Sequence, residues 1–246
     1  MTTVGFLYPG HAAEDDYPRI EALLGGAHRL VVEHTYGEDL HAVDALLALG
    51  SEDKLTEGAG RLAQYRPDAV LWACTSGSFV FGWDGAVDQA HKLSAAAGVP
   101  ASSTSFAFVH AARALGVGRV AVAASYPEEV AQRFVQFLDR GGIEVLSMSS
   151  AGIVTAAEVG QLPDDAVLEL ALRNDNPDAD ALLIPDTAMR TVGLVARLEA
   201  ELGKPVLTAN QVTVWEGLVL ASAEEVRPEA GSLFAADTWA RRMKRE

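Results

Sequence analysis

The sequence has little of what disulfides, nucleic-acid binding or membrane insertion require. It holds one cysteine, Cys74, among 246 residues, which excludes an internal disulfide and a thiolate-rich metal site. Basic residues are scarce, 19 against 34 acidic ones, and the net charge of −15 repels nucleic acid and anionic membranes. No HExxH pair, no leader-like start and no run near the ~18 apolar residues of a membrane span is present. We therefore expect a cytoplasmic protein without nucleic-acid or membrane partners.

The rest of the composition is that of a globular protein in which short strands alternate with helices. Hydrophobic residues make up 49% of the chain and charged residues 22%. Apolar runs predict strands at 4–8, 30–35, 69–73, 119–123, 143–148, 181–184 and 206–207. Helical periodicity predicts helices at 86–97, 105–115, 128–140, 164–173, 190–202 and 212–221. This alternation indicates an α/β fold with parallel sheets flanked by helices.

Three landmarks recur in the same order and indicate an internal duplication. The segment DAVLWACT at 68–75 resembles DALLIPDT at 180–187, and a Tyr-Pro pair follows a strand at 8–9 and at 126–127. Gly-x-Pro turns at 98–100 and 203–205 each end a helix and enter a strand. We expect two similar lobes related by a pseudo-twofold axis, 1–103 plus 210–246 and 104–209, with a cleft between them. The repeat matches Cys74 with Asp186, so both should approach one ligand from opposite sides.

Cys74 is the first candidate for chemistry. It ends an apolar strand and precedes the small polar loop Thr75-Ser76-Gly77-Ser78, whose N–H groups and hydroxyls can face a ligand. A helix starting there would lower the thiol pKa and make the thiolate more available. A lone cysteine in an apolar strand also packs as a small core residue, so both interpretations stay open.

Asp186 and Tyr126 are the candidates in the second half. Asp186 stands between apolar residues, where a carboxylate needs a partner or a proton, and it can act there as an acid or base. The alternative is a helix N-cap for a segment beginning near Met189. The phenol of Tyr126 can donate to a developing oxyanion, or its ring can simply pack at a strand edge.

The chain resembles the Asp/Glu racemase superfamily, in its maleate isomerase and arylmalonate decarboxylase branch, because several sequence stretches occur in the same order as in that family. They are VGFLYP at 4–9, ACTSGSF at 73–79, ALGVGRVAV at 114–122, YPEEV at 126–130, LEAELGKPV at 198–206 and NQVTVW at 210–215. The resemblance implies two similar α/β lobes around a cleft, and catalysis without a cofactor or a metal ion. It covers the chain from the first strand to about residue 221.

The resemblance also assigns residues. Cys74 matches the first catalytic cysteine of maleate isomerases, and Asp186 stands where that family has a second cysteine. The resemblance implies that residues after the strands hold the substrate carboxylate or an enediolate. These substrate-binding candidates are Thr75, Ser76, Tyr126, Thr187 and Asn210.

Two departures weaken maleate as the substrate. Ala12 and Ala156 stand where maleate isomerases place asparagines, which removes hydrogen bonds to a second carboxylate. Decarboxylases of this branch keep the second cysteine and lack the first, the reverse of this chain. The sequence thus predicts a cofactor-independent isomerase or racemase of a small carboxylic acid, acting through Cys74. A decarboxylase and a non-catalytic acid-binding protein are the alternatives, and we expect a homo-oligomer in each case.

Overall fold

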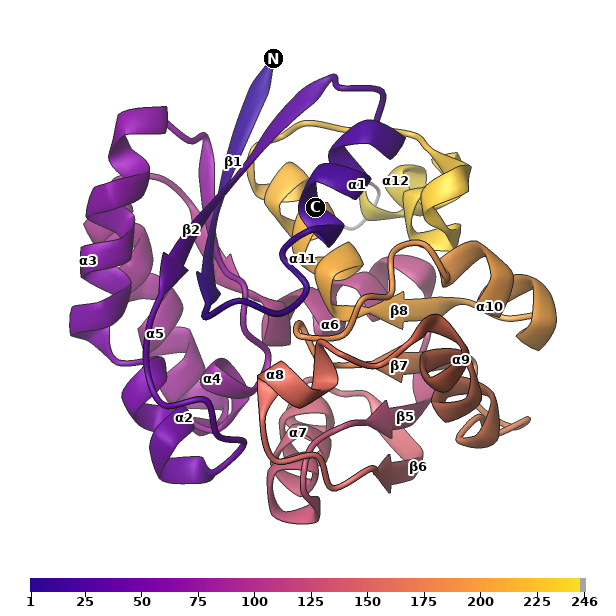
Figure 1. Cartoon of the computed structure of the whole chain (residues 1–246). Helices are drawn as coiled ribbons and strands as arrows, with labels where there is room; N and C mark the ends of the chain where they lie inside the picture. Colours follow the sequence, from indigo (N-terminus) through magenta and orange to yellow (C-terminus); the bar gives the residue numbers. More distant parts are fainter. Residues whose placement is uncertain (244–246) are drawn as a thin grey trace.

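Two four-stranded parallel sheets form the framework of the protein. The computed structural model describes residues 1–243 (Figure 1). The first sheet has the order β2-β1-β3-β4, with β1 (Thr2–Pro9), β2 (His28–Thr35), β3 (Ala69–Trp72) and β4 (Ala101–Ser103). The second has the order β6-β5-β7-β8, with β5 (Arg119–Ala124), β6 (Glu144–Ser150), β7 (Ala181–Ile184) and β8 (Val206–Thr208). Corresponding strands therefore occupy corresponding places, which agrees with the predicted repeat and confirms the fold class.

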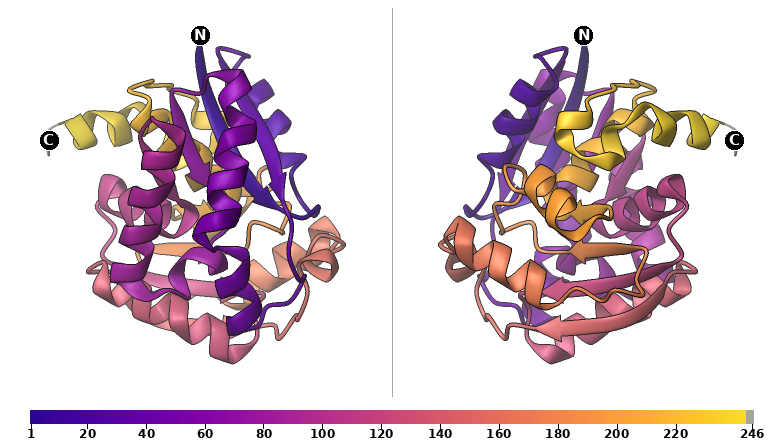
Figure 2. Two further views of the ribbon diagram at one scale, coloured as in Figure 1. Left: turned by 90° about the vertical axis from the view of Figure 1, so that its left-hand side faces the viewer. Right: turned by 90° about the vertical axis from the view of Figure 1, so that its right-hand side faces the viewer.

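Helices cover both faces of each sheet. In the first half they are α1 (Asp16–Leu23), α2 (Val43–Leu49), α3 (Glu52–Leu62), α4 (Ser76–Phe79), α5 (Gly82–Ala97) and α6 (Thr104–Leu115). Later in the chain they are α7 (Glu128–Arg140), α8 (Ala156–Val159), α9 (Asp164–Arg173), α10 (Val195–Leu202), α11 (Ala209–Leu220) and α12 (Ala236–Met243). Figure 2 looks onto α3 and α5 in its left view and onto α9 and α10 in its right view. Helices α6 and α11 pack on each other and contact strands of both sheets.

The strand β7 shows how these layers bury apolar residues. Ala181 and Leu183 belong to the large core that joins the two halves, whereas Leu182 and Ile184 belong to the smaller core under α9 and α10. Successive side chains of a strand point to opposite faces, so a strand covered on both faces must be apolar throughout. This explains the continuous apolar run in the sequence.

Three sequence-based expectations about the helices need correction. The helix predicted at 190–202 begins only at Val195, because the chain at 185–194 turns around buried polar groups instead. The last predicted helix begins earlier, at Ala209, where Thr208 and Gln211 form a capping box. Helices α1, α2, α3, α4, α8 and α12 were not predicted. In α3 the signal was obscured by Gly58, where an added Cβ would lie 2.7 Å from the Leu7 side chain, so the glycine permits close packing on β1.

Some expectations stay predictions at this level. The two sheets lie within 1–103 and 104–209, but the exact division into lobes, with 210–246 joined to the first, is a prediction, as is a homo-oligomer. No helix within residues 1–243 is both long and apolar enough to cross a membrane.

Candidate active site

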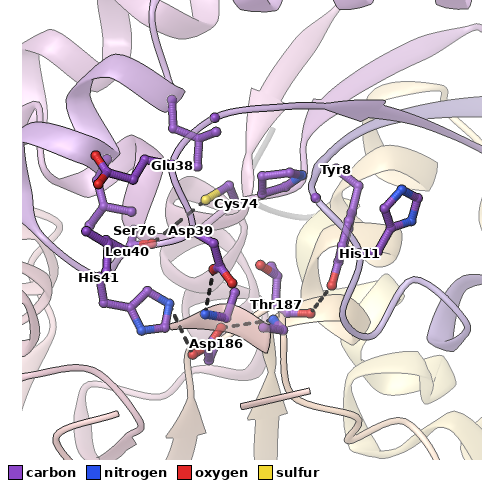
Figure 3. Close-up of a pocket in the computed structure, with 17 residues that line it drawn as sticks. Tyr8, His11, Glu38, Asp39, Leu40, His41, Cys74, Ser76, Asp186 and Thr187 are labelled. Atoms are coloured by element: carbon purple, nitrogen blue, oxygen red, sulfur yellow. Dashed lines mark hydrogen bonds and ion pairs between the residues drawn. The ribbon is translucent and has the colours of Figure 1, made fainter. Parts of the chain in front are cut away.

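A cavity of about 320 Å³ lies where strands of both sheets end, and both halves of the chain line it (Figure 3). Its lining residues are Tyr8, Pro9, Gly10, His11, Gly37, Glu38, Asp39, Leu40, His41, Leu46, Leu49, Cys74, Ser76, Ala156, Asp186, Thr187 and Ala188. Cavities of this size and mixed polarity hold small molecules. Cys74 follows β3 and Asp186 follows β7, so parallel strands deliver both to the cavity at their carboxyl ends.

Cys74 is enclosed rather than exposed. The backbone N–H of Gly77 donates to its Sγ at 3.2 Å, and the Ser76 hydroxyl lies 3.8 Å from it. Burial raises the pKa of the Cys74 thiol to about 11, and these two groups offset only part of the rise. The expected lowering by a helix N-terminus is therefore wrong. Helix α4 does begin at Ser76, but it is one turn long and desolvation outweighs it.

Asp186 is held by donors on both oxygens. The Ala188 N–H donates to Oδ1 at 2.9 Å, and the Ser125 hydroxyl donates to Oδ2 through a short hydrogen bond. The Nε2 of His41 lies 3.9 Å from Oδ2 (Figure 3). The carboxylate is 3% exposed, so these contacts replace the water that it loses.

The alternative role of Asp186 as a helix cap does not hold. Its side chain accepts the N–H of Ala188 within a turn, and the next helix begins only at Val195. Because Asp186 caps no helix and lines the cavity, its side chain is available for chemistry or for binding.

Tyr126 and Asn210 are buried among backbone groups, and neither is among the lining residues. The Tyr126 hydroxyl donates to the Pro185 carbonyl at 2.7 Å. Burial and the charge of Asp186 raise the pKa of the Tyr126 phenol. The Asn210 amide donates to the Thr187 carbonyl at 3.1 Å. Both residues thus hold the turn that carries Asp186.

The remaining candidates divide between the cavity wall and its support. Ser76 and Thr187 line the cavity. Thr75 is fully buried behind them, and its carbonyl accepts a hydrogen bond from Ser105 at 2.8 Å. Of the two alanines that stand for family asparagines, Ala156 lines the cavity and Ala12 does not.

Sequence reasoning missed three residues here. Tyr8 donates to the Thr187 carbonyl and accepts from the Ala13 N–H, both at 2.9 Å. Ser125 follows β5 and could have been found by the strand-end rule that selected its neighbour Tyr126. His41 gives no local signal, because it lies in an irregular segment between β2 and α2.

The cavity is rich in acidic groups. Glu38, Asp39 and Asp186 line it, against two imidazoles, His11 and His41, and no Lys or Arg among the described lining residues. A dicarboxylate would meet like charge there, which costs binding energy.

One group of described residues could hold a metal ion. It consists of His11, Glu14 and His34, whose possible ligand atoms lie within 4.8 Å of one another. His11 also lines the cavity, so the group stands at its rim rather than beside Cys74. The His11 ring already pairs with Glu14 at 3.0 Å.

Comparison with known proteins finds one branch of enzymes. The family model described as arylmalonate decarboxylase matches residues 26–234. Arylmalonate decarboxylase from Bordetella bronchiseptica is 28% identical over 185 residues, which cover 74% of this chain and 77% of that protein. Maleate isomerase from Nocardia farcinica is 27% identical over 187 residues, 72% of this chain and 73% of that protein.

A solved structure extends the likeness to the whole fold. It is a liganded double mutant of arylmalonate decarboxylase, in which one glycine is changed to cysteine and one cysteine to serine. The TM-score is 0.86 at 25% identity, with 95% of this chain and 99% of that chain covered.

Proposed function

The chain belongs to the arylmalonate decarboxylase family, and from that premise we propose that it is a cofactor-independent racemase-type isomerase of a small monocarboxylic acid. The relatives are isomerases and a decarboxylase, so the protein is an enzyme. The observation that carries the finer proposal is that Cys74 and Asp186 reach one cavity from the ends of corresponding strands.

The two groups suit proton transfer on opposite faces of one carbon. In one direction the Asp186 carboxylate removes the proton next to the substrate carboxylate, which leaves an enediolate or carbanion-like species. The Cys74 thiol then gives its proton to the other face and is left as a thiolate. In the reverse direction the thiolate accepts the proton and the protonated Asp186 returns one. Solvent protons restore the starting state, so charge and atoms balance.

Hydrogen-bond donors at the two turns would hold the substrate. Ser76 and Thr187 line the cavity on the Cys74 side and the Asp186 side, and their hydroxyls can donate to the substrate carboxylate. Tyr126 and Asn210, which the resemblance assigns to substrate binding, support the Asp186 turn in this proposal.

The thiol favours proton transfer over addition to an alkene. Addition requires a thiolate, and the raised pKa of Cys74 keeps the free enzyme in the thiol form at neutral pH. A thiol is, in contrast, ready to donate a proton. The acidic lining also disfavours a dianion such as maleate.

Decarboxylation is the second candidate, and the family match favours it. A carbanion left by loss of carbon dioxide needs one proton donor, and the Cys74 thiol can supply it. The base Asp186 would then have no proton to remove and would only crowd the departing carboxylate.

A panel of small acids in heavy water, followed by proton NMR, distinguishes these functions. The panel contains α-amino, α-hydroxy, α-aryl and dicarboxylic acids, each as a single enantiomer where one exists. The racemase proposal predicts loss of the signal next to the carboxylate, together with the opposite enantiomer by chiral chromatography. A product lacking one carboxyl group supports decarboxylation instead. Binding of an acid without exchange, inversion or loss of carbon overturns both.

A further inference from the structure

His41 stands beside Asp186 although nothing in the sequence led to it. It lies between β2 and α2 of the first half, is 8% exposed, and lines the cavity. Its backbone N–H donates to the Val154 carbonyl at 2.8 Å, and its Nδ1 lies 3.0 Å from the Ile153 carbonyl. The segment carrying His41 is therefore fastened to the second half of the chain.

The Ile153 contact determines which ring nitrogen of His41 is free. A carbonyl oxygen only accepts, so Nδ1 must carry a proton and Nε2 keeps the lone pair of the neutral ring. The Tyr126 ring meets the imidazole edge-on at a centroid distance of 5.0 Å, which limits its rotation. The free Nε2 is thus directed at Asp186 Oδ2, 3.9 Å away.

Other groups near this pair are acidic or neutral. Asp186 and Tyr126 face His41 from the second half, and Cys74 lines the same cavity from the end of β3. From its own segment, Asp39 accepts the N–H groups of Ala156 and Ala157, and Glu38 lines the cavity. Of these side chains, His41 is the one with a basic nitrogen next to Asp186, so its Nε2 can take up a proton that arrives on the carboxylate.

We propose that His41 is the proton relay of Asp186, which exchanges the proton that Asp186 gains or loses with solvent. The inference rests on the proposed proton-transfer function. The protonated Asp186 carboxyl passes its proton to Nε2, which gives a carboxylate and an imidazolium, and no other bond changes. The distance of 3.9 Å exceeds a hydrogen bond, so the two groups must approach by about 1 Å. His41 acts through Asp186 and is a positioning residue rather than a catalytic one.

The test measures isotope exchange in heavy water for wild type and His41→Asn. Asparagine keeps a donor for the Ile153 carbonyl but has no lone-pair nitrogen toward Asp186, so the fold and the segment contact are retained. In wild type the relay replaces the proton on Asp186 with deuterium, and recovered substrate becomes labelled. In His41→Asn we expect the ratio of labelled recovered substrate to inverted product to fall about 10-fold. An unchanged ratio, whatever the loss in kcat, overturns the relay.

A titration without substrate separates this inference from the proposed function. Proton NMR follows the His41 ring signal against pH in wild type and in Asp186→Asn, with the exposed His91 on α5 as internal reference. Loss of the carboxylate should move the His41 midpoint to lower pH, because the imidazolium loses its neighbouring negative charge. His91 should not move. An unchanged His41 midpoint overturns the coupling even if the enzyme proves active, and a clear shift supports it even if no acid on the panel is turned over.

Discussion

The turns after β3 and β7 occupy corresponding places in two sheets of one strand order, yet they present opposite chemistry to the cavity. After β3, which ends at Trp72, a one-turn helix begins at Ser76, and the Cys74 sulfur receives one N–H at 3.2 Å. After β7 no helix follows for ten residues, and Asp186 receives the N–H of Ala188 and the hydroxyl of Ser125. One framework therefore supports a neutral acid on one side and a hydrogen-bonded carboxylate on the other.

The difference shows that the position of a residue at a strand end and the environment of its side chain have separate causes. The repeat places Cys74 and Asp186 at corresponding strand ends, whereas the charge of each depends on its burial and on the donors around it. A duplicated fold can thus carry an acid and a base at equivalent positions, which is what two-sided proton transfer requires.

The largest effect is expected at Cys74. Cys74→Ser keeps the shape of the side chain but replaces the thiol with a much weaker acid, so kcat should fall ~10³-fold. Steady-state kinetics on the acid found with the panel measures this, and calorimetry should show substrate affinity close to wild type. A kcat near that of wild type would show that the Cys74 sulfur takes no part in the reaction.

On the opposite side, Asp186→Asn should lower kcat by ~10². The amide keeps an oxygen for the Ala188 N–H, so the melting temperature should change little. Unchanged turnover with a lower melting temperature would make Asp186 a structural residue, and the comparison between the turns would lose its functional meaning.

The rate of alkylation of Cys74 tests whether its side chain is a neutral thiol, in contrast to the carboxylate of Asp186. The raised pKa of Cys74, about 11, predicts that native protein reacts with iodoacetamide at pH 7 on the order of 100-fold more slowly than free cysteine. The rate should climb as the pH rises towards 11, because the thiolate fraction increases. Protein unfolded in urea serves as the control, since its only cysteine is then exposed. Fast native alkylation at pH 7 would show that a thiolate is present after all.

The smallest effects are expected from the two serines beside the reactive groups. Ser125→Ala removes a hydrogen bond to Asp186 and should lower kcat by about 10-fold. The Ser76 hydroxyl lies 3.8 Å from the Cys74 sulfur, so Ser76→Ala should lower kcat by only about 2-fold. The two variants are compared by kcat at saturating substrate, because Ser76 also lines the cavity and its loss can raise KM. An equal fall in kcat for both variants would contradict the view that Ser125 supports Asp186 more strongly than Ser76 supports Cys74.

Much of the architecture could be predicted from the sequence. The helices at 128–140 and 164–173 and the strand at 181–184 have the predicted bounds, because strong periodicity and apolar runs coincide with turn residues there. Helix α3 was not predicted because its glycines resemble a loop, and the place of Gly58 is explained only by its packing on Leu7. The candidate pair Cys74 and Asp186 followed from the repeat, and the structure brings both to one cavity.

The order of apolar runs, the two matching halves and the residues at the strand ends were determined by the sequence, since each depends on neighbours along the chain. Only the tertiary structure decided that Cys74 is a buried thiol, that Tyr126 and Asn210 brace a turn, and that His41 faces Asp186. Burial, and contacts between residues from 23 to 145 positions apart in the chain, set these properties, and no local pattern encodes them.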